Sequence, residues 1–212
     1  MTKQTINKRI KLKQQLFNLI LTASFIAISL LTCYISDILP KVSGISIEFY
    51  LVVVIISFVL IPNKWYQIVY LILFSLIRML VIPISAINFA DLLLEYFLPL
   101  DIFIFYLGTI NYYQFLNKKL VKSSLLIFCI SLLIFTVFIM LIRLFCFVLA
   151  GYLWYTNGNW YASFIYEISG YWVSIIVVLI VLGILIVPIM KLVPILQKKY
   201  LAFTPIKTKL KE

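Results

Sequence analysis

Long apolar runs alternate along the chain with short polar or proline-containing connections. Six runs have the character of membrane spans, at residues 16–39, 47–61, 66–86, 91–110, 125–155 and 162–196. About 20 apolar residues in a helix cross the hydrocarbon core of a bilayer, so each run is predicted to be one transmembrane helix. The two longest are expected to tilt or to extend past the bilayer. The pattern predicts an all-α integral membrane protein whose single domain, 1–212, contains six transmembrane helices.

The composition supports this class and excludes others. Of the 212 residues, 65% are hydrophobic and 12% are charged. A soluble domain needs more polar surface to cover its core, and a disordered chain could not keep so much apolar surface in water. Six helices also leave no room for a sizeable soluble domain in a chain of this length.

Lysine and arginine residues gather on alternate connections, and this predicts the orientation. Basic residues precede the first span, follow the last, and occur in the connections after the second and fourth spans, whereas the other connections contain only Lys41. Because cytoplasmic segments of membrane proteins are enriched in Lys and Arg, both termini are predicted to be cytoplasmic. The net charge of +11 is explained by this orientation signal and by attraction to anionic lipid, so it does not indicate nucleic-acid binding.

Several kinds of chemistry are excluded by residues that the sequence lacks. The chain contains no histidine, which excludes catalytic triads, Cys–His dyads and His-ligated zinc or haem. Cys33, Cys129 and Cys146 lie in separate apolar runs and are expected to be small buried hydrophobic residues. No glycine-rich phosphate loop precedes Lys-Ser or Lys-Thr. The sequence therefore predicts no enzyme, no metal site and no cofactor, and any ATP would be hydrolysed by other subunits.

Acidic residues gather toward the predicted outer side of the membrane. Six of the seven carboxylates lie at the outer surface, in the outer half of a span or near mid-depth: Asp37, Glu48, Asp91, Glu95, Asp101 and Glu167. The seventh, Glu212, is predicted to be cytoplasmic. Carboxylates inside a membrane are costly, and they face a water-filled cavity or a basic partner. One interpretation pairs Arg78 with Asp101 and Arg143 with Glu167. Even with both pairs formed, an acidic outer vestibule remains.

Aromatic residues concentrate on the same side, around the connection between the last two spans. They are Tyr152, Trp154, Tyr155, Trp160, Tyr161, Phe164, Tyr166, Tyr171 and Trp172. For any single one of them, an interfacial aromatic belt is as good an explanation as a ligand contact. Carboxylates next to aromatic rings, however, suit an organic cation or a flat heteroaromatic ligand, through ion pairing and cation–π attraction. The sequence therefore predicts a ligand site that opens to the outside.

Two segments resemble a known family. The first is Leu93-Leu94-Glu95-Tyr96 followed by Pro99, and the second is Phe145-x-Phe147-x-x-Ala150-Gly151-x-x-Trp154-Tyr155 followed by Trp160 and Tyr166. They resemble the fourth helix and the fifth-to-sixth helix region of thiamine-specific S components, the substrate-binding subunits of energy-coupling factor (ECF) vitamin transporters. Ala23-x-x-x-Ala27 is similar to the small-residue pattern by which S components pack on their transmembrane coupling subunit.

The resemblance implies a set of ligand-binding residues. Glu95 would face the cationic or aminopyrimidine part of thiamine, with Tyr96 beside it. Trp154 or Tyr155, depending on a one-residue choice of alignment, would stack on the ligand ring, and Gly151 would allow close approach. The other expected contacts are Trp160, Tyr166, Tyr171 and Arg143. Tyr171 stands where the family has an asparagine, and Arg143 stands where it has a lysine.

The resemblance also implies partners. The chain would act in the cell membrane, as a multi-pass subunit of an ABC-type importer with a coupling subunit and two ATPases. Because Phe147 stands in place of a family histidine and other polar pocket residues are replaced, the ligand stays open. Beside thiamine, the alternatives are another vitamin, a thiamine precursor or a phosphorylated form bound by Arg143.

Two other classes of function remain open from the sequence. The first is a stand-alone secondary transporter, in which Asp101 and Arg78 near mid-depth would serve a proton relay. The chain is short for that mechanism and shows no inverted repeat. The second is a structural or assembly subunit whose aromatic residues form only an interfacial belt.

Overall fold

The computed structural model describes residues 3–39, 41, 45, 47–81, 87–107, 109, 111–113, 116 and 124–202. Every element formed by these residues is helical. Parts of two predicted spans, residues 82–86, 108 and 110, lie outside the described residues, so the ends predicted for those spans are not described.

The elements in chain order are α1 (Lys3–Ile38), α2 (Tyr50–Leu60), α3 (Lys64–Val81), α4 (Phe89–Leu92), η1 (Leu93–Phe97), α5 (Leu98–Asp101), η2 (Ile102–Tyr106), α7 (Ser124–Ala150), η3 (Gly151–Tyr155) and α8 (Trp160–Ala202). The segments η1 and η3 are π-helical, and η2 is a 3-10 helix. The elements from α4 to η2 follow one another without a break and correspond to the predicted span 91–110.

Among the described residues, five helical stretches are long and apolar enough to cross a membrane: Leu12–Ile38, Lys64–Val81, Phe89–Tyr113, Leu125–Tyr155 and Trp160–Val193. The all-helical membrane class predicted from the sequence is therefore confirmed. The remaining predicted span, 47–61, forms only α2, which has 11 residues. At about 1.5 Å per residue α2 is about 16 Å long, roughly half of the ~30 Å hydrocarbon core.

Local sequence ends α2 on its C-terminal side. Ile61 has extended backbone, with φ −76° and ψ 113°, as expected for a residue that precedes proline, here Pro62. The last carbonyls of a helix lack partners inside the helix. Gln67 of α3 supplies two donors from its Nε2, to the carbonyls of Phe58 at 2.7 Å and Ile61 at 2.8 Å. The short helix can therefore end inside the bundle.

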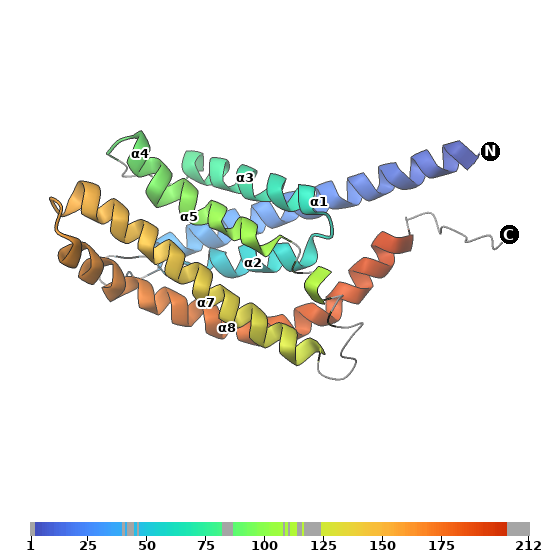
Figure 1. Ribbon diagram of the computed structural model, residues 1–212. Helices are drawn as coiled ribbons and strands as arrows, with labels where there is room; N and C mark the ends of the chain where they lie inside the picture. Colours follow the sequence, from blue (N-terminus) through green and yellow to red (C-terminus); the bar gives the residue numbers. More distant parts are fainter. Residues whose placement is uncertain are drawn as a thin grey trace.

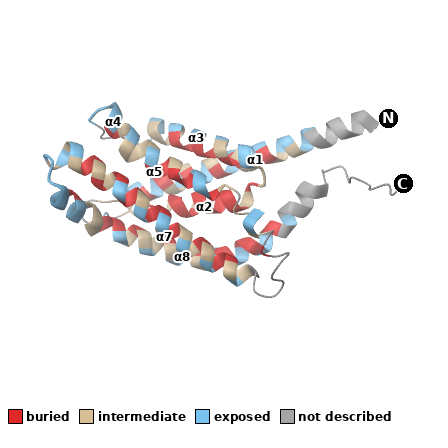
Figure 2. Ribbon diagram, viewed as in Figure 1, coloured by how far each residue is buried: buried red, intermediate tan, exposed pale blue. Residues whose placement is uncertain are grey.

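The helix α2 forms the centre of the bundle. Most of its residues are buried (Figure 2), and it contacts α1, α3, α8 and η2. Two of these neighbours, α1 and α3, are joined to each other by a buried hydrogen bond of 2.6 Å between Ser29 and Tyr70. The Tyr70 ring stacks on Phe74, with centroids 6.0 Å apart. The core is thus built around one short apolar helix.

The two ends of the bundle differ. The helix α1 begins and α8 ends at one end, and the opposite end, called the distal end below, carries α4 and η3 (Figure 1). The helices α7 and α8 pack against each other and are joined at the distal end by residues 156–159. Asn157 and Gly158 in this turn have positive φ values of 50° and 77°, which Asn and Gly adopt most readily.

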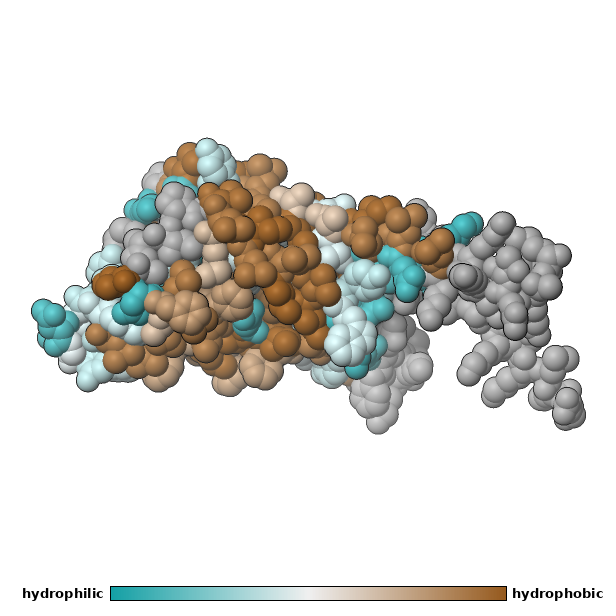
Figure 3. Space-filling model, turned by 90° about the horizontal axis from the view of Figure 1, so that it is seen from above, coloured by the Kyte–Doolittle hydropathy of each residue, from teal (hydrophilic) through white to brown (hydrophobic). Residues whose placement is uncertain are grey.

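The surface of the bundle is strongly apolar. In Figure 3, hydrophobic side chains cover the middle of the molecule and polar side chains lie toward its ends. Exposed large hydrophobic residues occur on α1, α3, α7 and α8, for example Leu31, Leu80, Ile134 and Ile184. Soluble proteins rarely expose such continuous apolar surface. This surface agrees with the membrane class that the helix lengths define.

Candidate ligand-binding site

A π-helical turn lies in η1, where the resemblance places its acidic residue. The Leu98 N–H bonds to the carbonyl of Leu93, five residues earlier. Pro99 explains the wide turn, because proline has no N–H and its ring would clash with the carbonyl of Glu95 in a regular α-helix. Isolated π-turns of this kind are frequent at functional sites.

The second π-helical turn, η3, continues α7 into the distal end. The Thr156 N–H bonds to the Gly151 carbonyl at 2.9 Å. Gly151 lies so close to α8 that a Cβ at this position would collide with the Ser163 hydroxyl. That hydroxyl donates to the Val148 carbonyl at 2.7 Å. Glycine at this position therefore permits the close approach of η3 and α8 with the Ser163 hydroxyl in its observed place.

A cavity of about 520 Å³ lies at these segments. Its lining combines η1, η3, the turn that follows η3 and the first turns of α8: Glu95, Gly151, Tyr155, Thr156, Ala162, Ser163, Tyr166 and Glu167. Small-molecule sites generally have volumes of roughly 300–1,000 Å³. The cavity is therefore large enough for a small organic ligand, and its lining contains two carboxylates, two phenols and no basic side chain.

The carboxylates near the cavity lack full partners. The charges of Glu95 and Glu167 interact with each other, and Asp91 interacts with Glu95. Tyr155 donates to Oδ2 of Asp91 at 2.8 Å, and the Ile87 N–H donates to the same oxygen at 2.9 Å. Among the described residues, Oδ1 of Asp91 and Oε2 of Glu95 are buried without a hydrogen-bond partner. Because buried unpaired carboxylate oxygens are costly, a ligand with positive charge and N–H donors would complete this site.

The structure brings some of the predicted site residues together and leaves others apart. Glu95, Gly151, Tyr155 and Tyr166 line the one cavity, and of the two alignment choices it is Tyr155 that reaches it. The other predicted contacts lie outside the lining: Tyr96, Arg143, Trp154, Trp160 and Tyr171.

Trp160 and Tyr171 contact other aromatic rings. The Trp160 ring packs against Phe145 and Tyr152, with centroids 5.9 and 5.5 Å apart. The Tyr171 ring is buried and makes an edge contact with Phe147, at 5.5 Å between centroids. In this structure, both residues stabilise the packing of α7 against α8 next to the cavity.

Arg143 pairs with Glu48, and the expected pairing with Glu167 is wrong. Nη2 of Arg143 lies 2.9 and 3.0 Å from the two carboxylate oxygens of Glu48. Its Nε donates to the Tyr171 hydroxyl at 3.1 Å, and the Tyr50 hydroxyl donates to Glu48 at 2.6 Å. The expectation rested on depth in the membrane, whereas Glu167 faces the cavity and Arg143 lies in the interior at 1% exposure.

Arg78 does not pair with Asp101, so this expectation is also wrong. The guanidinium lies over the rings of Tyr50 and Tyr96, 5.0 and 5.7 Å from their centroids. Across the described ranges, no acid lies within 4.0 Å of Arg78, and Oδ1 of Asp101 is buried without a partner. The π-turn before Pro99 adds a residue to one turn and rotates the following helix, so similar depth did not predict contact.

Glu167 and Ser163 were not among the ligand contacts predicted from the sequence. Ser163, Tyr166 and Glu167 are spaced by three and four residues and therefore share one face of α8. With Tyr166 assigned to the site, this spacing was the signal that could have added the other two. The expected pairing with Arg143 had given Glu167 a different role.

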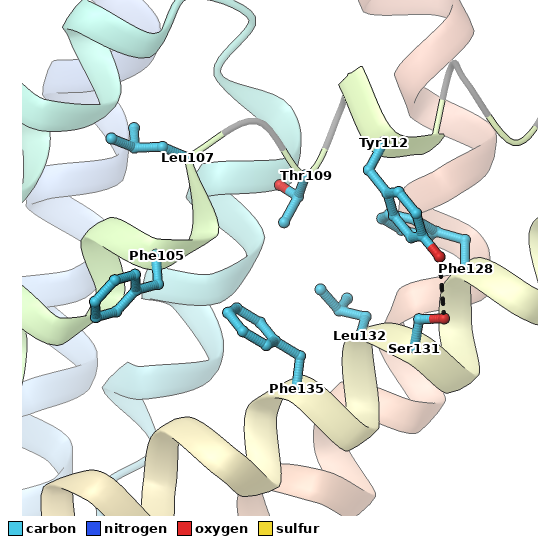
Figure 4. A pocket seen from close by; sticks show the side chains of 8 residues that line it. All are labelled: Phe105, Leu107, Thr109, Tyr112, Phe128, Ser131, Leu132 and Phe135. Carbon is cyan, nitrogen blue, oxygen red and sulfur yellow. Dashed lines mark hydrogen bonds between the residues drawn. The ribbon is translucent and has the colours of Figure 1, made fainter.

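A second cavity, of about 300 Å³, lies away from the distal end. Figure 4 shows Phe105 and Phe135 on its two sides and a hydrogen bond of 3.5 Å between Tyr112 and Ser131. None of its eight lining residues is charged: Phe105, Leu107, Thr109, Tyr112, Phe128, Ser131, Leu132 and Phe135. This cavity is a largely apolar crevice without the charged groups that would select a polar ligand.

No family model, no curated protein and no solved structure matches this chain. The fold itself defines the class, a helical membrane protein with five helices long and apolar enough to cross a bilayer. Within that class, the distal cavity with Glu95 and Glu167 is the candidate functional site.

Proposed function

We propose that this protein is the substrate-binding S component of an ECF-type vitamin importer, and that it binds thiamine or a related cationic vitamin in the distal cavity. The observation that carries the proposal is the joining of Glu95 and Glu167 with the phenols of Tyr155 and Tyr166 around one cavity. Glu95, Tyr155 and Tyr166 belong to the two segments that resemble the family, and Glu167 follows Tyr166 directly.

The chemistry of the cavity favours a cationic aromatic ligand. Carboxylates attract a cation more strongly where water is largely displaced, and aromatic faces add cation–π attraction of about 0.5–2 kcal/mol. The buried Oε2 of Glu95 would accept a hydrogen bond from an amino group of the ligand. Tyr155 and Tyr166 would contact the flat part of the ligand.

The proposal includes an orientation and partners. The distal end would face outside, because the Lys and Arg residues outside the spans, apart from Lys41, occur in the sequence at the termini and in the connections after the second and fourth spans. Ala23 and Ala27 are both exposed on α1, where a coupling subunit would approach closely over small side chains. Energy would come from ATPase subunits of the complex.

Ligand titration of the purified full chain tests the proposal. Thiamine is expected to change the tryptophan fluorescence saturably. Glu95→Gln and Glu167→Gln should each weaken binding about tenfold, the loss of one charge-assisted hydrogen bond of roughly 1.4 kcal/mol or more. Asp37→Asn is the matched control, because Asp37 is an exposed acid in the last turn of α1 and does not line the cavity.

The control separates a specific site from a general negative potential. Equal weakening by all three substitutions would show that only surface charge attracts the ligand. Absence of binding by thiamine, with binding of another vitamin that depends on Glu95, would keep the class and change the ligand. No response to any cationic vitamin would contradict the proposal.

A second candidate function is a stand-alone carrier. It is favoured by Asp101, whose Oδ1 is buried within a membrane-length stretch without a partner among the described residues, since such carboxylates serve proton transfer in carriers. Proteoliposomes containing this chain alone would then accumulate substrate when a pH gradient is imposed. Uptake that needs ATPase subunits, and is unchanged by Asp101→Asn, would exclude the carrier.

A further inference from the structure

Arg78 lies over two aromatic rings, those of Tyr50 and Tyr96. The guanidinium carbon lies 5.0 Å from the centroid of the Tyr50 ring and 5.7 Å from that of Tyr96. Tyr50 opens α2 and Tyr96 lies in η1, so rings from two separate elements hold one cation of α3.

Arg78 forms no ion pair with an acid among the described residues. By contrast, Arg143, which is buried, has both oxygens of Glu48 within 3.0 Å. Arg78 has no carboxylate within 4.0 Å in the portion of the chain that is described, and its Nε is buried without a partner. The Cys33 thiol lies beside Arg78 and interacts with it. Cation–π contacts stabilise a guanidinium but do not neutralise it.

Arg78 lies near the ligand cavity but is not one of the residues that line it. Tyr96, which covers the guanidinium, is the residue after the cavity-lining Glu95. The helix α3 contacts η1, and the charges of Arg78 and Glu95 interact. A basic group with one buried N–H that lacks a partner among the described residues therefore stands near an acidic cavity, an arrangement that fits a ligand carrying charges of both signs.

We propose that Arg78 binds a phosphate group of the ligand whose cationic part lies between Glu95 and Glu167, so that the preferred ligand is the phosphate ester of a cationic vitamin. The inference rests on the proposed function and specifies its substrate class. Guanidinium donors match phosphate oxygens in pairs, and such bonds are about twice as strong as neutral ones. Arg143, the phosphate contact considered from the sequence, is already occupied by Glu48.

The test compares thiamine with thiamine monophosphate on the full chain in detergent or nanodiscs. The wild-type protein should bind the ester about tenfold more tightly than thiamine, as expected for a charge-assisted bidentate contact. Arg78→Gln should abolish that preference and leave thiamine binding within about threefold, while Arg78→Lys should retain part of it. Lys191→Gln, which removes an exposed charge on α8, is the matched control.

The outcomes separate this inference from the proposed function. A preference for the ester that survives in Arg78→Gln, or tighter binding of thiamine by the wild type, would overturn it. If no thiamine compound binds, the proposed function fails, and inorganic phosphate then tests Arg78 alone. An increase in Tm with phosphate in the wild type but not in Arg78→Gln would still support anion binding by Arg78. An equal increase in both proteins, or none, would overturn the inference.

Discussion

Arg143 of α7 and Glu48, 95 positions earlier in the chain, form an ion pair inside the bundle with N–O distances of 2.9 and 3.0 Å. Glu48 lies just before α2 begins, and its own N–H donates to the Ser174 hydroxyl of α8 at 3.4 Å. These contacts therefore fix the start of the central short helix to α7 and to α8, and α8 lines the cavity.

Removal of one partner of this pair is expected to destabilise the protein strongly. Arg143→Met would leave Glu48 charged and buried, at a cost of about 3–5 kcal/mol in the free energy of unfolding, whereas the double variant Arg143→Met/Glu48→Leu should recover much of that loss. Unfolding followed by circular dichroism in detergent measures each value. If the double variant is no more stable than Arg143→Met, the loss of stability does not come from leaving Glu48 without its partner.

The sequence could predict the class of fold because the length and apolarity of a helix are local properties. The runs at 125–155 and 162–196, for example, correspond to the spanning stretches Leu125–Tyr155 and Trp160–Val193. The length of α2 could not be predicted from apolarity alone. Glu48 interrupts the run, and its effect depends on Arg143, which only the folded bundle brings beside it.

Only part of the site could be predicted, because the sequence does not show how each helix is rotated about its axis. Motif spacing selected Tyr166 and Tyr171 together, but residues five apart on an α-helix are rotated by about 140° around its axis. Tyr166 consequently lines the cavity, while Tyr171 points to Arg143 in the interior. Depth in the membrane can be estimated from sequence, but the rotation of each helix depends on packing, and π-turns such as η1 change it further.

Gln67 is expected to stabilise the protein by capping α2. Gln67→Met keeps the length of the side chain but removes both hydrogen bonds to the carbonyls of Phe58 and Ile61. In membrane proteins such bonds contribute about 0.6 kcal/mol each on average, so the free energy of unfolding should fall by roughly 1–2 kcal/mol. Gln15→Met on the exposed part of α1 is the control and should change it little. Equal effects of both substitutions would contradict the capping role.

Ala23 and Ala27 are expected to matter for assembly and not for folding. Both are exposed on α1, so Leu at either position meets no buried neighbour of this chain, and the Tm should stay within about 2 °C, as for other surface substitutions. Close packing on a coupling subunit would be lost, because small residues let helix backbones approach. Co-purification of the ATPase subunits with wild-type and substituted chains measures this. Undiminished recovery with both substitutions would show that another face binds the partner.

Gly151 is expected to be indispensable for the shape of the cavity. A Cβ at this position collides with the Ser163 hydroxyl and would lie 3.8 Å from Oε1 of Glu167. Gly151→Ala should therefore push α8 away from η3, displace Glu167 and weaken ligand binding about tenfold or more, with a loss of stability of about 1–3 kcal/mol from overpacking. Titration and thermal unfolding of the same sample measure the two effects.

A second glycine in the same pair of helices supplies the control for Gly151→Ala. No atom lies within 4 Å of a Cβ built on Gly183 of α8, so Gly183→Ala should leave binding unchanged and stabilise the helix by up to about 1 kcal/mol. Addition of Ser163→Ala to Gly151→Ala removes the colliding hydroxyl and leaves the Ser163 Cβ position at 3.4 Å, which should restore part of the affinity. Wild-type binding by Gly151→Ala would instead show that the ligand does not depend on the contact between η3 and α8.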